Sequence, residues 1–236
     1  MRVAVILALL AVPISAVATG DNATDSITYD IVAVEGKLFL EIEPEARRLN
    51  AGAQAVSGDR LRTGSSSSAT IGVPSYTTVF RLGAKTSCTL AHDRPGVLLH
   101  VERGRLRAMF GSTTGTDPRL VTTPSAVLAV RGTEYGVKVK KNGDTQVVVF
   151  DGVVEVTDPA GENPPVRLEA GMQTRAKRGQ PVEKPAPHRI SPVDWDQGRS
   201  APPPGMGAGG AGAGSQGGSS GAGAGGSGSG SKRRGG

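Results

Sequence analysis

Histidine, cysteine and serine, which often carry out chemistry in proteins, are few or badly spaced in this chain. The three histidines, His92, His100 and His188, include no pair at the spacing of a metal site, and the single cysteine, Cys88, cannot complete a thiolate cluster. The serine run at residues 65–68 lacks the glycine frame of a nucleophilic serine, and no G-x-S-x-G sequence occurs. The sequence therefore predicts a protein without catalytic residues, metal or cofactor.

Two weaker sources of chemistry stay open at this point. A carboxylate pair suited to glycoside hydrolysis could lie among the scattered acidic residues, because spacing in sequence does not give separation in space. The aromatic content of 3% argues against a polysaccharide hydrolase, since sugar sites commonly stack on tryptophan or tyrosine. Cys88 lies in a strand-like stretch, residues 86–90, which predicts a small semi-buried thiol rather than a reactive one.

The first residues have the pattern of an export signal. Arg2 precedes an apolar run from Val3 to Val17, which is shorter than the roughly 20 residues that span a bilayer and is interrupted by Pro13. The small residues at 16–18 fit a signal-peptidase site. Residues 1–18 are therefore predicted to be a signal peptide, with an uncleaved anchor or a buried N-terminal helix as the alternative. No later segment is apolar enough to span a membrane.

The composition changes near residue 180. Residues 181–204 are rich in proline, which predicts an extended linker, and residues 205–236 are mostly Gly, Ser and Ala, which predicts a disordered tail. The remaining body, residues 27–180, is long enough for one domain with its own core. Without Arg2 and the basic residues 232–234, the formal charge falls from +6 to about +2, so a nucleic-acid partner is not expected.

Apolar residues in the body recur with a period of two, or in short runs closed by glycine, proline or Asn/Asp turns. This pattern predicts an all-β fold, a rolled or folded-over, mainly antiparallel sheet of the β-roll or sandwich kind. Gly36, Gly104 and Gly152 each stand between two apolar stretches and predict strand–turn–strand units. Asn142-Gly143 predicts a hairpin with a two-residue type I′ turn, and the turn at Gly152 would extend it to a three-stranded meander over residues 134–157. The strands are expected at residues 29–34, 37–43, 69–73, 78–82, 97–102, 105–110, 126–131, 135–140, 145–150 and 153–157.

Three stretches resemble one known family. Residues 58–64, Gly-Asp-Arg-Leu-Arg-Thr-Gly, resemble the first half of a FecR domain, and residues 98–106 resemble its glycine-turn hairpin. The most specific match is residues 122–135, with a Thr-Pro entry, an apolar strand and then Arg131-Gly132-Thr133-Glu134-Tyr135. The chain is thus similar to the FecR-domain family over about residues 27–180, although residues 73–76 depart from the usual turn.

The resemblance implies a non-enzymatic protein of the bacterial periplasm or cell exterior. The best-known members of the family are transmembrane regulators that pass a signal from an outer-membrane receptor to a sigma factor. No segment precedes the predicted signal in this sequence, and no spanning helix follows it. The resemblance therefore implies a free-standing exported FecR-domain protein, in the periplasm or secreted to the cell surface.

The leading hypothesis is a binding or scaffold module for a protein or glycan of the cell envelope, with a role in signalling. The alternative is a structural envelope or surface protein that uses the Gly-rich tail as a spacer or anchor. Arg131, Gly132 and Thr133 are interpreted as structural, because glycine allows the backbone to bend while Arg and Thr can bond neighbouring carbonyls. The alternative is that Arg131 and Glu134 face a ligand groove. The sequence leaves the partner and the oligomeric state open.

Overall fold

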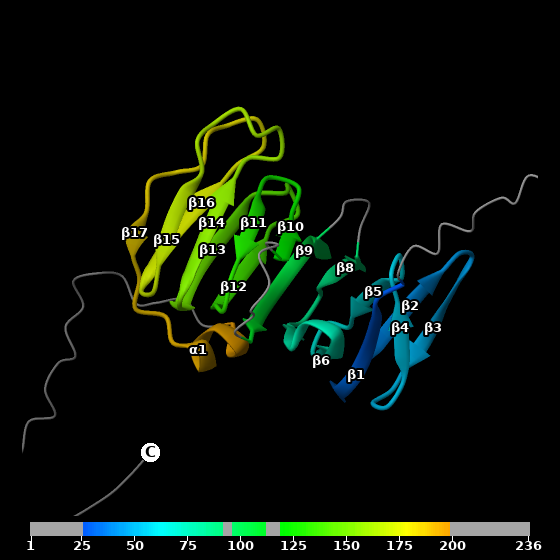
Figure 1. Ribbon diagram of the computed structural model, residues 1–236. Coiled ribbons are helices and arrows are strands. Elements are labelled where there is room, and N and C mark those ends of the chain that lie inside the picture. The colour runs from blue at the N-terminus through cyan, green and yellow to red at the C-terminus, as the bar shows by residue number, and fades with distance from the viewer. Residues whose placement is uncertain (1–25, 92–95, 112–118, 199–236) are drawn as a thin grey trace, which may run out of the picture. The chain divides into compact units, whose positions relative to one another are not determined.

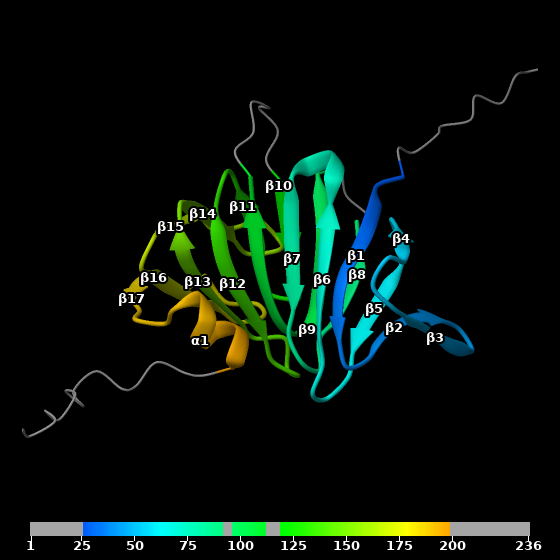
Figure 2. The ribbon, with the colours of Figure 1, turned by 90° about the horizontal axis from the view of Figure 1, so that it is seen from below.

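Alternating burial along the strands follows directly from the sequence. In β6 (Ser68–Val73) and β7 (Thr78–Leu82) every second side chain is buried, because successive side chains of a strand point to opposite faces. The computed structural model describes residues 26–91, 96–111 and 119–198. These residues form one sheet folded into two layers around the core (Figures 1 and 2), so the predicted folded-over all-β class is confirmed.

The two layers are named sheet A and sheet B, and β9 (Val97–Phe110) belongs to both. The strand order in sheet A is β4 (Gln54–Val56), β1 (Thr28–Glu35), β6, β7, the C-terminal half of β9, β12 (Glu134–Val139), β13 (Thr145–Asp151), β16 (Met172–Ala176) and β17 (Ala186–Pro187). The order in sheet B is β3 (Glu45–Leu49), β2 (Leu38–Ile42), β5 (Arg60–Thr63), β8 (Ser87–Leu90), the N-terminal half of β9, β10 (Arg119–Thr122), β11 (Val127–Val130), β14 (Val153–Thr157) and β15 (Val166–Glu169). A short 3-10 turn, Pro74–Tyr76, joins β6 to β7. Neighbouring strands in both orders are antiparallel, except that β9 and β10 are parallel.

Glycines mark three points where the chain passes from one layer to the other. Gly36 lies between β1 of sheet A and β2 of sheet B, Gly152 lies between β13 and β14, and Gly104 lies within β9. Their φ angles are +84°, +79° and +105° respectively, a backbone region that glycine enters readily and other residues rarely. The repeated strand–glycine–strand pattern in the sequence therefore corresponds to crossings between the layers.

Two hairpins expected from the sequence do not form, because the chain passes to the other layer at their glycines. The glycine-turn hairpin over residues 98–106 is a single continuous strand, β9, which changes layer at Gly104. The three-stranded meander over residues 134–157 does not form, because β14 pairs with β11 and β15 in sheet B. A glycine turn can be predicted from local residues, but whether the next strand returns beside the previous one depends on which layer offers it a free edge.

The hairpin between β12 and β13 forms where the sequence predicts it, but its turn is of a different type. The Lys140 N–H donates to the Asp144 carbonyl, and the Gly143 N–H donates to the Lys140 carbonyl, both at 2.9 Å. Gly143 has a φ of +88°, whereas Asn142 is not among the residues with positive φ. The connection is therefore a three-residue loop with glycine in the left-handed position, and the predicted two-residue type I′ turn is wrong.

Two tyrosines are fully buried in the core and differ in what their hydroxyl groups contact. The Tyr29 hydroxyl donates to the Leu98 carbonyl at 2.7 Å. The Tyr135 hydroxyl has no hydrogen-bond partner among the described residues, and its ring stacks on Phe110 with the ring centroids 5.9 Å apart. Burial raises the pKa of both hydroxyls. Tyr135 therefore carries a buried polar group that has lost its hydration without gaining a partner.

We expect Tyr135→Phe to raise the free energy of unfolding by about 1 kcal/mol, because it removes an unsatisfied buried hydroxyl and keeps the ring. Tyr29→Phe is the matched control, since it deletes the same atom but leaves the Leu98 carbonyl without its donor. That control should lose about 1–2 kcal/mol. Urea denaturation measures both variants, and a loss of stability in Tyr135→Phe would contradict the prediction by showing that a buried water satisfies the hydroxyl.

Residues 181–198, here named the strap, pack against sheet A instead of running as the expected linker. They include β17 and the short helix α1 (Pro192–Gln197) (Figure 2). The Ser191 hydroxyl caps the helix by accepting a hydrogen bond from the Asp194 N–H at 3.1 Å. The predicted signal peptide at 1–18, the rest of the predicted linker and the tail at 205–236 lie outside the described residues. Within the described ranges, no helix has the length and hydropathy to cross a membrane.

Candidate functional site

The signature Arg131-Gly132-Thr133 forms the crossing from β11 in sheet B to β12 in sheet A. Gly132 has a φ of +59°. Thr133 is buried, and its hydroxyl donates to the Val153 carbonyl at 2.8 Å. The Thr133 carbonyl in turn accepts a hydrogen bond from the Phe110 N–H at 3.0 Å. Thr133 thus joins this crossing to β9 of sheet A and to β14 of sheet B.

A second crossing packs directly against the signature. A Cβ atom added at Gly152 would lie 2.7 Å from the Gly132 carbonyl oxygen and 3.0 Å from the Thr133 hydroxyl oxygen. The Arg131 side chain is exposed. Glu134 accepts a hydrogen bond at 2.7 Å from Nε of Arg107. The structural interpretation of Arg131, Gly132 and Thr133 and the alternative groove role of Arg131 and Glu134 both stay predictions.

Substitutions within the signature should separate the two interpretations. We expect Thr133→Val to lower the free energy of unfolding by about 1–3 kcal/mol, because it removes the buried donor to the Val153 carbonyl. Arg131→Ala, at an exposed position, should change stability by less than about 1 kcal/mol. Thermal unfolding measures both variants. A stable Arg131→Ala variant that loses a partner would favour the groove, and equal stability of Thr133→Val and the wild type would contradict the structural role.

Cys88 and His100 lie on the neighbouring strands β8 and β9, one position apart in register, so their side chains point to opposite faces of sheet B. Cys88 is fully buried, and burial raises the pKa of its thiol, which keeps it protonated and unreactive. His100 contacts the Thr122 hydroxyl through Nδ1 at 2.8 Å, His188 belongs to the strap, and His92 lies outside the described residues. No group of three or more His, Cys, Asp or Glu side chains in the described ranges is placed to hold a metal ion.

Trp195 holds the strap on the outer face of sheet A. Its side chain is 3% exposed, and its Nε1–H donates to the Leu106 carbonyl at 2.9 Å. The ring lies over Gly136, where an added Cβ would come within 2.4 Å of a ring atom. The ring also meets Phe150 edge-on, with the centroids 6.2 Å apart. Gly136 is therefore the position in β12 that makes room for the indole.

Trp195 was not expected from the sequence as a docking residue, because it lies in a proline-rich stretch. A local signal was nevertheless present. Ser191 followed by Pro192, with Asp194 at the third helical position and Gly198 after the last turn, is typical of a short capped helix. That pattern predicts the helix, but it does not predict the surface on which the helix packs.

Charged side chains join α1 to the same face of sheet A. The Asp196 carboxylate lies 2.7 Å from Arg107 and 3.4 Å from Arg81, and Glu134 contacts Arg107 on its other side. Burial lowers the pKa of Arg107, but hydrogen bonds to Glu134 and Asp196 outweigh burial and raise it overall. A small hollow of about 190 Å³ beside these groups is lined in part by Glu35. The face thus already accommodates carboxylates next to arginines.

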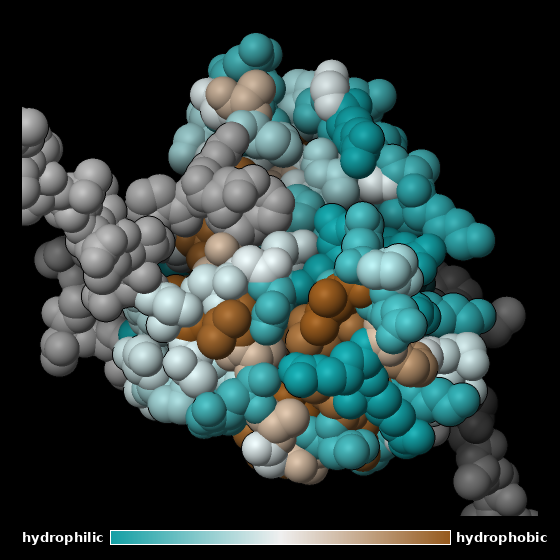
Figure 3. Space-filling view, turned by 90° about the vertical axis from the view of Figure 1, so that its right-hand side faces the viewer, coloured by the Kyte–Doolittle hydropathy of each residue, from teal (hydrophilic) through white to brown (hydrophobic). Residues whose placement is uncertain are grey.

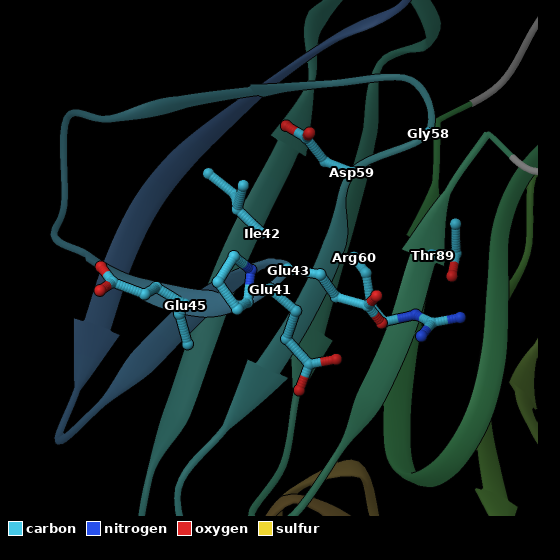
Figure 4. Close-up of a pocket in the computed structure, with 10 residues that line it drawn as sticks. Glu41, Ile42, Glu43, Glu45, Gly58, Asp59, Arg60 and Thr89 are labelled. Atoms are coloured by element: carbon cyan, nitrogen blue, oxygen red, sulfur yellow. The ribbon is translucent and has the colours of Figure 1, made fainter.

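The β3 end of the molecule carries a larger hollow and an exposed strand. The hollow, of about 470 Å³, lies between the β2–β3 hairpin and β5 and is lined in part by Glu43, Glu45, Asp59 and Arg60 (Figure 4). Ile42, at the end of β2, also lines it and is 52% exposed. Figure 3 shows apolar surface exposed among hydrophilic side chains at this end. In β3 itself, four of the five residues are exposed, and β2 is its one partner among the described strands.

A protein-family model matches the central part of this architecture. Residues 59–155 match the family model described as FecR protein. This segment, 97 of the 236 residues, is similar to the FecR family. The matched segment of the FecR domain runs from just before β5 into β14 and includes β9, the Arg131-Gly132-Thr133 crossing and the β12–β13 hairpin. The flanking strands β1–β4 and β15–β17 lie outside the matched range but belong to the same two layers.

Among solved structures, the chain is similar to two crystal structures, both described as a "putative anti-sigma factor" from Parabacteroides distasonis ATCC 8503. In each case the sequence identity is 20%, the TM-score is 0.46, and the similarity covers 55% of this chain. The chain spans 59% of the length of those two proteins. No curated protein matches the sequence.

Proposed function

We propose that this FecR-domain protein is an exported, non-catalytic binding or scaffold module that holds a protein or glycan partner in the bacterial cell envelope and takes part in signalling. The family match supports a regulatory, non-catalytic role. The export signal predicted at residues 1–18 supports a location in the periplasm or at the cell surface. The structural feature that carries the proposal is the exposed edge at β3.

An edge strand can bind a protein partner through its backbone. β3 is paired on one side by β2 and is exposed along four of its five residues, so N–H and C=O groups on its outer side are available to an added strand. Arg47 and Arg48 also have a protective effect, because charged side chains discourage indiscriminate pairing of an open edge. Glu45 and the exposed Ile42 beside the edge offer side-chain contacts that an added strand can use for specificity.

Proline substitutions in β3 test this edge. In an edge strand, successive N–H groups point alternately toward the neighbouring strand and toward solvent. Of the two variants Ala46→Pro and Arg47→Pro, one therefore removes an N–H that points to solvent, and the other removes an N–H that pairs with β2. The variant that breaks the pairing with β2 should have the lower melting temperature, which identifies it. Arg167→Pro in β15, on another exposed strand of sheet B, is the control.

The full-length protein and these variants are used to capture partners from fractionated cell envelope, and the retained proteins and glycans are identified by mass spectrometry. We expect the wild type and Arg167→Pro to retain the same specific partner. The β3 variant with a wild-type melting temperature should lose it. Retention by that variant would exclude the β3 edge, and an empty capture by the folded wild type would favour the structural alternative.

A further inference from the structure

A row of three cations crosses the outer face of sheet A beside the strap. Arg105 in β9 lies directly opposite Lys138 in β12. Lys138 lies opposite Gln146 in β13, which in turn lies opposite Arg175 in β16. Residues that are directly opposite in neighbouring strands project from the same face of the sheet. Arg105, Lys138 and Arg175, here named the cationic row, therefore share the face on which α1 packs.

The cationic row is not neutralised by ion pairs within the described residues. None of the salt bridges there involves Arg105, Lys138 or Arg175. The Arg105 guanidinium lies over the Trp195 ring, 5.7 Å from its centroid; burial lowers the pKa of Arg105, and the nearby Asp196 offsets only part of this effect. Burial lowers the pKa of Lys138, and the charges of Arg105 and Lys140 lower it further. Like charges placed directly opposite in a sheet are destabilising. An anionic ligand on this row would relieve that repulsion.

The strap shows which kind of anion this face accepts. Asp196 of α1 places its carboxylate 2.7 Å from Arg107 and 3.4 Å from Arg81, one row away from Arg105 along β9. A short acidic segment is thus already bound to arginines of the same face. Residues 199–236 contain no Asp or Glu, so no side-chain carboxylate of these residues can pair with the cationic row.

We propose that the cationic row binds an acidic peptide segment of a protein partner, laid across β9, β12, β13 and β16 beside the strap. Neighbouring strands lie about 4.8 Å apart, so the row offers cations about 5 Å and then about 10 Å apart. An extended peptide presents side chains on one face about 7 Å apart, and the long Lys and Arg side chains can reach carboxylates at that spacing. A peptide can also lie alongside α1, whereas a flat membrane surface would meet the helix first.

The test uses the full-length protein and a fluorescently labelled peptide of alternating Glu and Ala, about eight residues long, at low salt where charge interactions are least screened. We expect the wild type to bind this peptide and not the matching Gln/Ala peptide. Lys138→Gln and Arg175→Gln should each weaken binding about fivefold to tenfold. The control Arg167→Gln removes an equal charge from β15 in the other layer and should leave binding unchanged.

Three results would overturn the proposal. They are no binding of the Glu/Ala peptide, an equal loss of binding in Arg167→Gln, or tighter binding of an anionic polysaccharide or of phosphatidylglycerol vesicles than of the peptide. Thermal unfolding provides a second readout. Lys138→Gln should melt at or above the wild-type temperature because it relieves repulsion, so its weaker binding would not come from loss of fold.

The cationic row extends the proposed function to a second surface, away from the β3 edge. The experiments can reject the cationic row and the β3 edge independently of each other. Loss of peptide binding in Lys138→Gln together with unchanged capture by the β3 proline variants would support the cationic row and reject the edge. Loss of capture in the β3 variant with no binding of the acidic peptide would support the edge and reject the cationic row.

Discussion

Gly104→Ala is expected to lower the free energy of unfolding by about 3–5 kcal/mol, which is a large part of the stability of an ordinary domain. Gly104 has a φ of +105°, and an added Cβ would lie 2.4 Å from Cα of Thr86. Thr86 cannot move away easily, because its hydroxyl accepts from the Arg105 N–H at 3.0 Å and donates to the Gly83 carbonyl at 2.8 Å. The substitution therefore strains the crossing of β9, which among the described strands is the one that belongs to both layers.

The matched control is Gly171→Ala. Gly171 has a φ of +81°, but no atom lies within 4 Å of its would-be Cβ, so alanine there carries the cost of the backbone conformation alone. That cost should be about 1 kcal/mol. Urea denaturation followed by far-UV circular dichroism measures both variants. Equal losses at Gly104 and Gly171 would contradict the prediction, because they would mean that the contact with Thr86 relaxes without cost.

Gly136→Ala is expected to detach the strap from sheet A. The added methyl group would lie 2.4 Å from the Trp195 ring, which is 3% exposed and held by the hydrogen bond to Leu106. Losing the burial of this indole should cost about 3 kcal/mol or more. Trp195 is the single tryptophan of the chain, so its fluorescence should shift toward that of an exposed indole while the sandwich stays folded.

A double-mutant cycle separates detachment of the strap from damage to β12. If Gly136→Ala acts through Trp195, its cost should vanish in a Trp195→Ala background. In the Trp195→Ala background, alanine at position 136 could even stabilise β12, since glycine weakens a strand interior. Circular dichroism measures the stability of all four proteins, because two of them lack the fluorophore. A full cost of Gly136→Ala in the absence of Trp195 would contradict the proposed contact.

The strand pattern and the class of fold could be predicted from the sequence because both depend on local alternation. Residues 69–73 and 78–82 were expected as strands and correspond closely to β6 and β7. The strands β3, β4, β5, β10, β15, β16 and β17 were not among the expected strands. Each has at most one buried apolar residue and owes its pairing to neighbours elsewhere in the chain, so the local pattern gives little sign of it.

The candidate sites also differ in whether they could be located from the sequence. The Arg131-Gly132-Thr133 signature could be located from sequence because it is a contiguous motif, and its glycine indicates a bend. The cationic row could not be located, because Arg105, Lys138 and Arg175 come together only through the pairing of β9, β12, β13 and β16. Their separation along the chain gives no indication of this register.

The sequence by itself determined the all-β class, the FecR resemblance and the positions at which the backbone must bend, since each depends on residue type and local spacing. The tertiary structure alone decided which bends are hairpins and which are crossings between layers, that Trp195 packs over Gly136, and which charges share a face. The physical reason is that strand pairing is a long-range interaction. A strand joins whichever free edge and apolar surface the rest of the folded chain presents to it, and no local stretch of sequence contains that information.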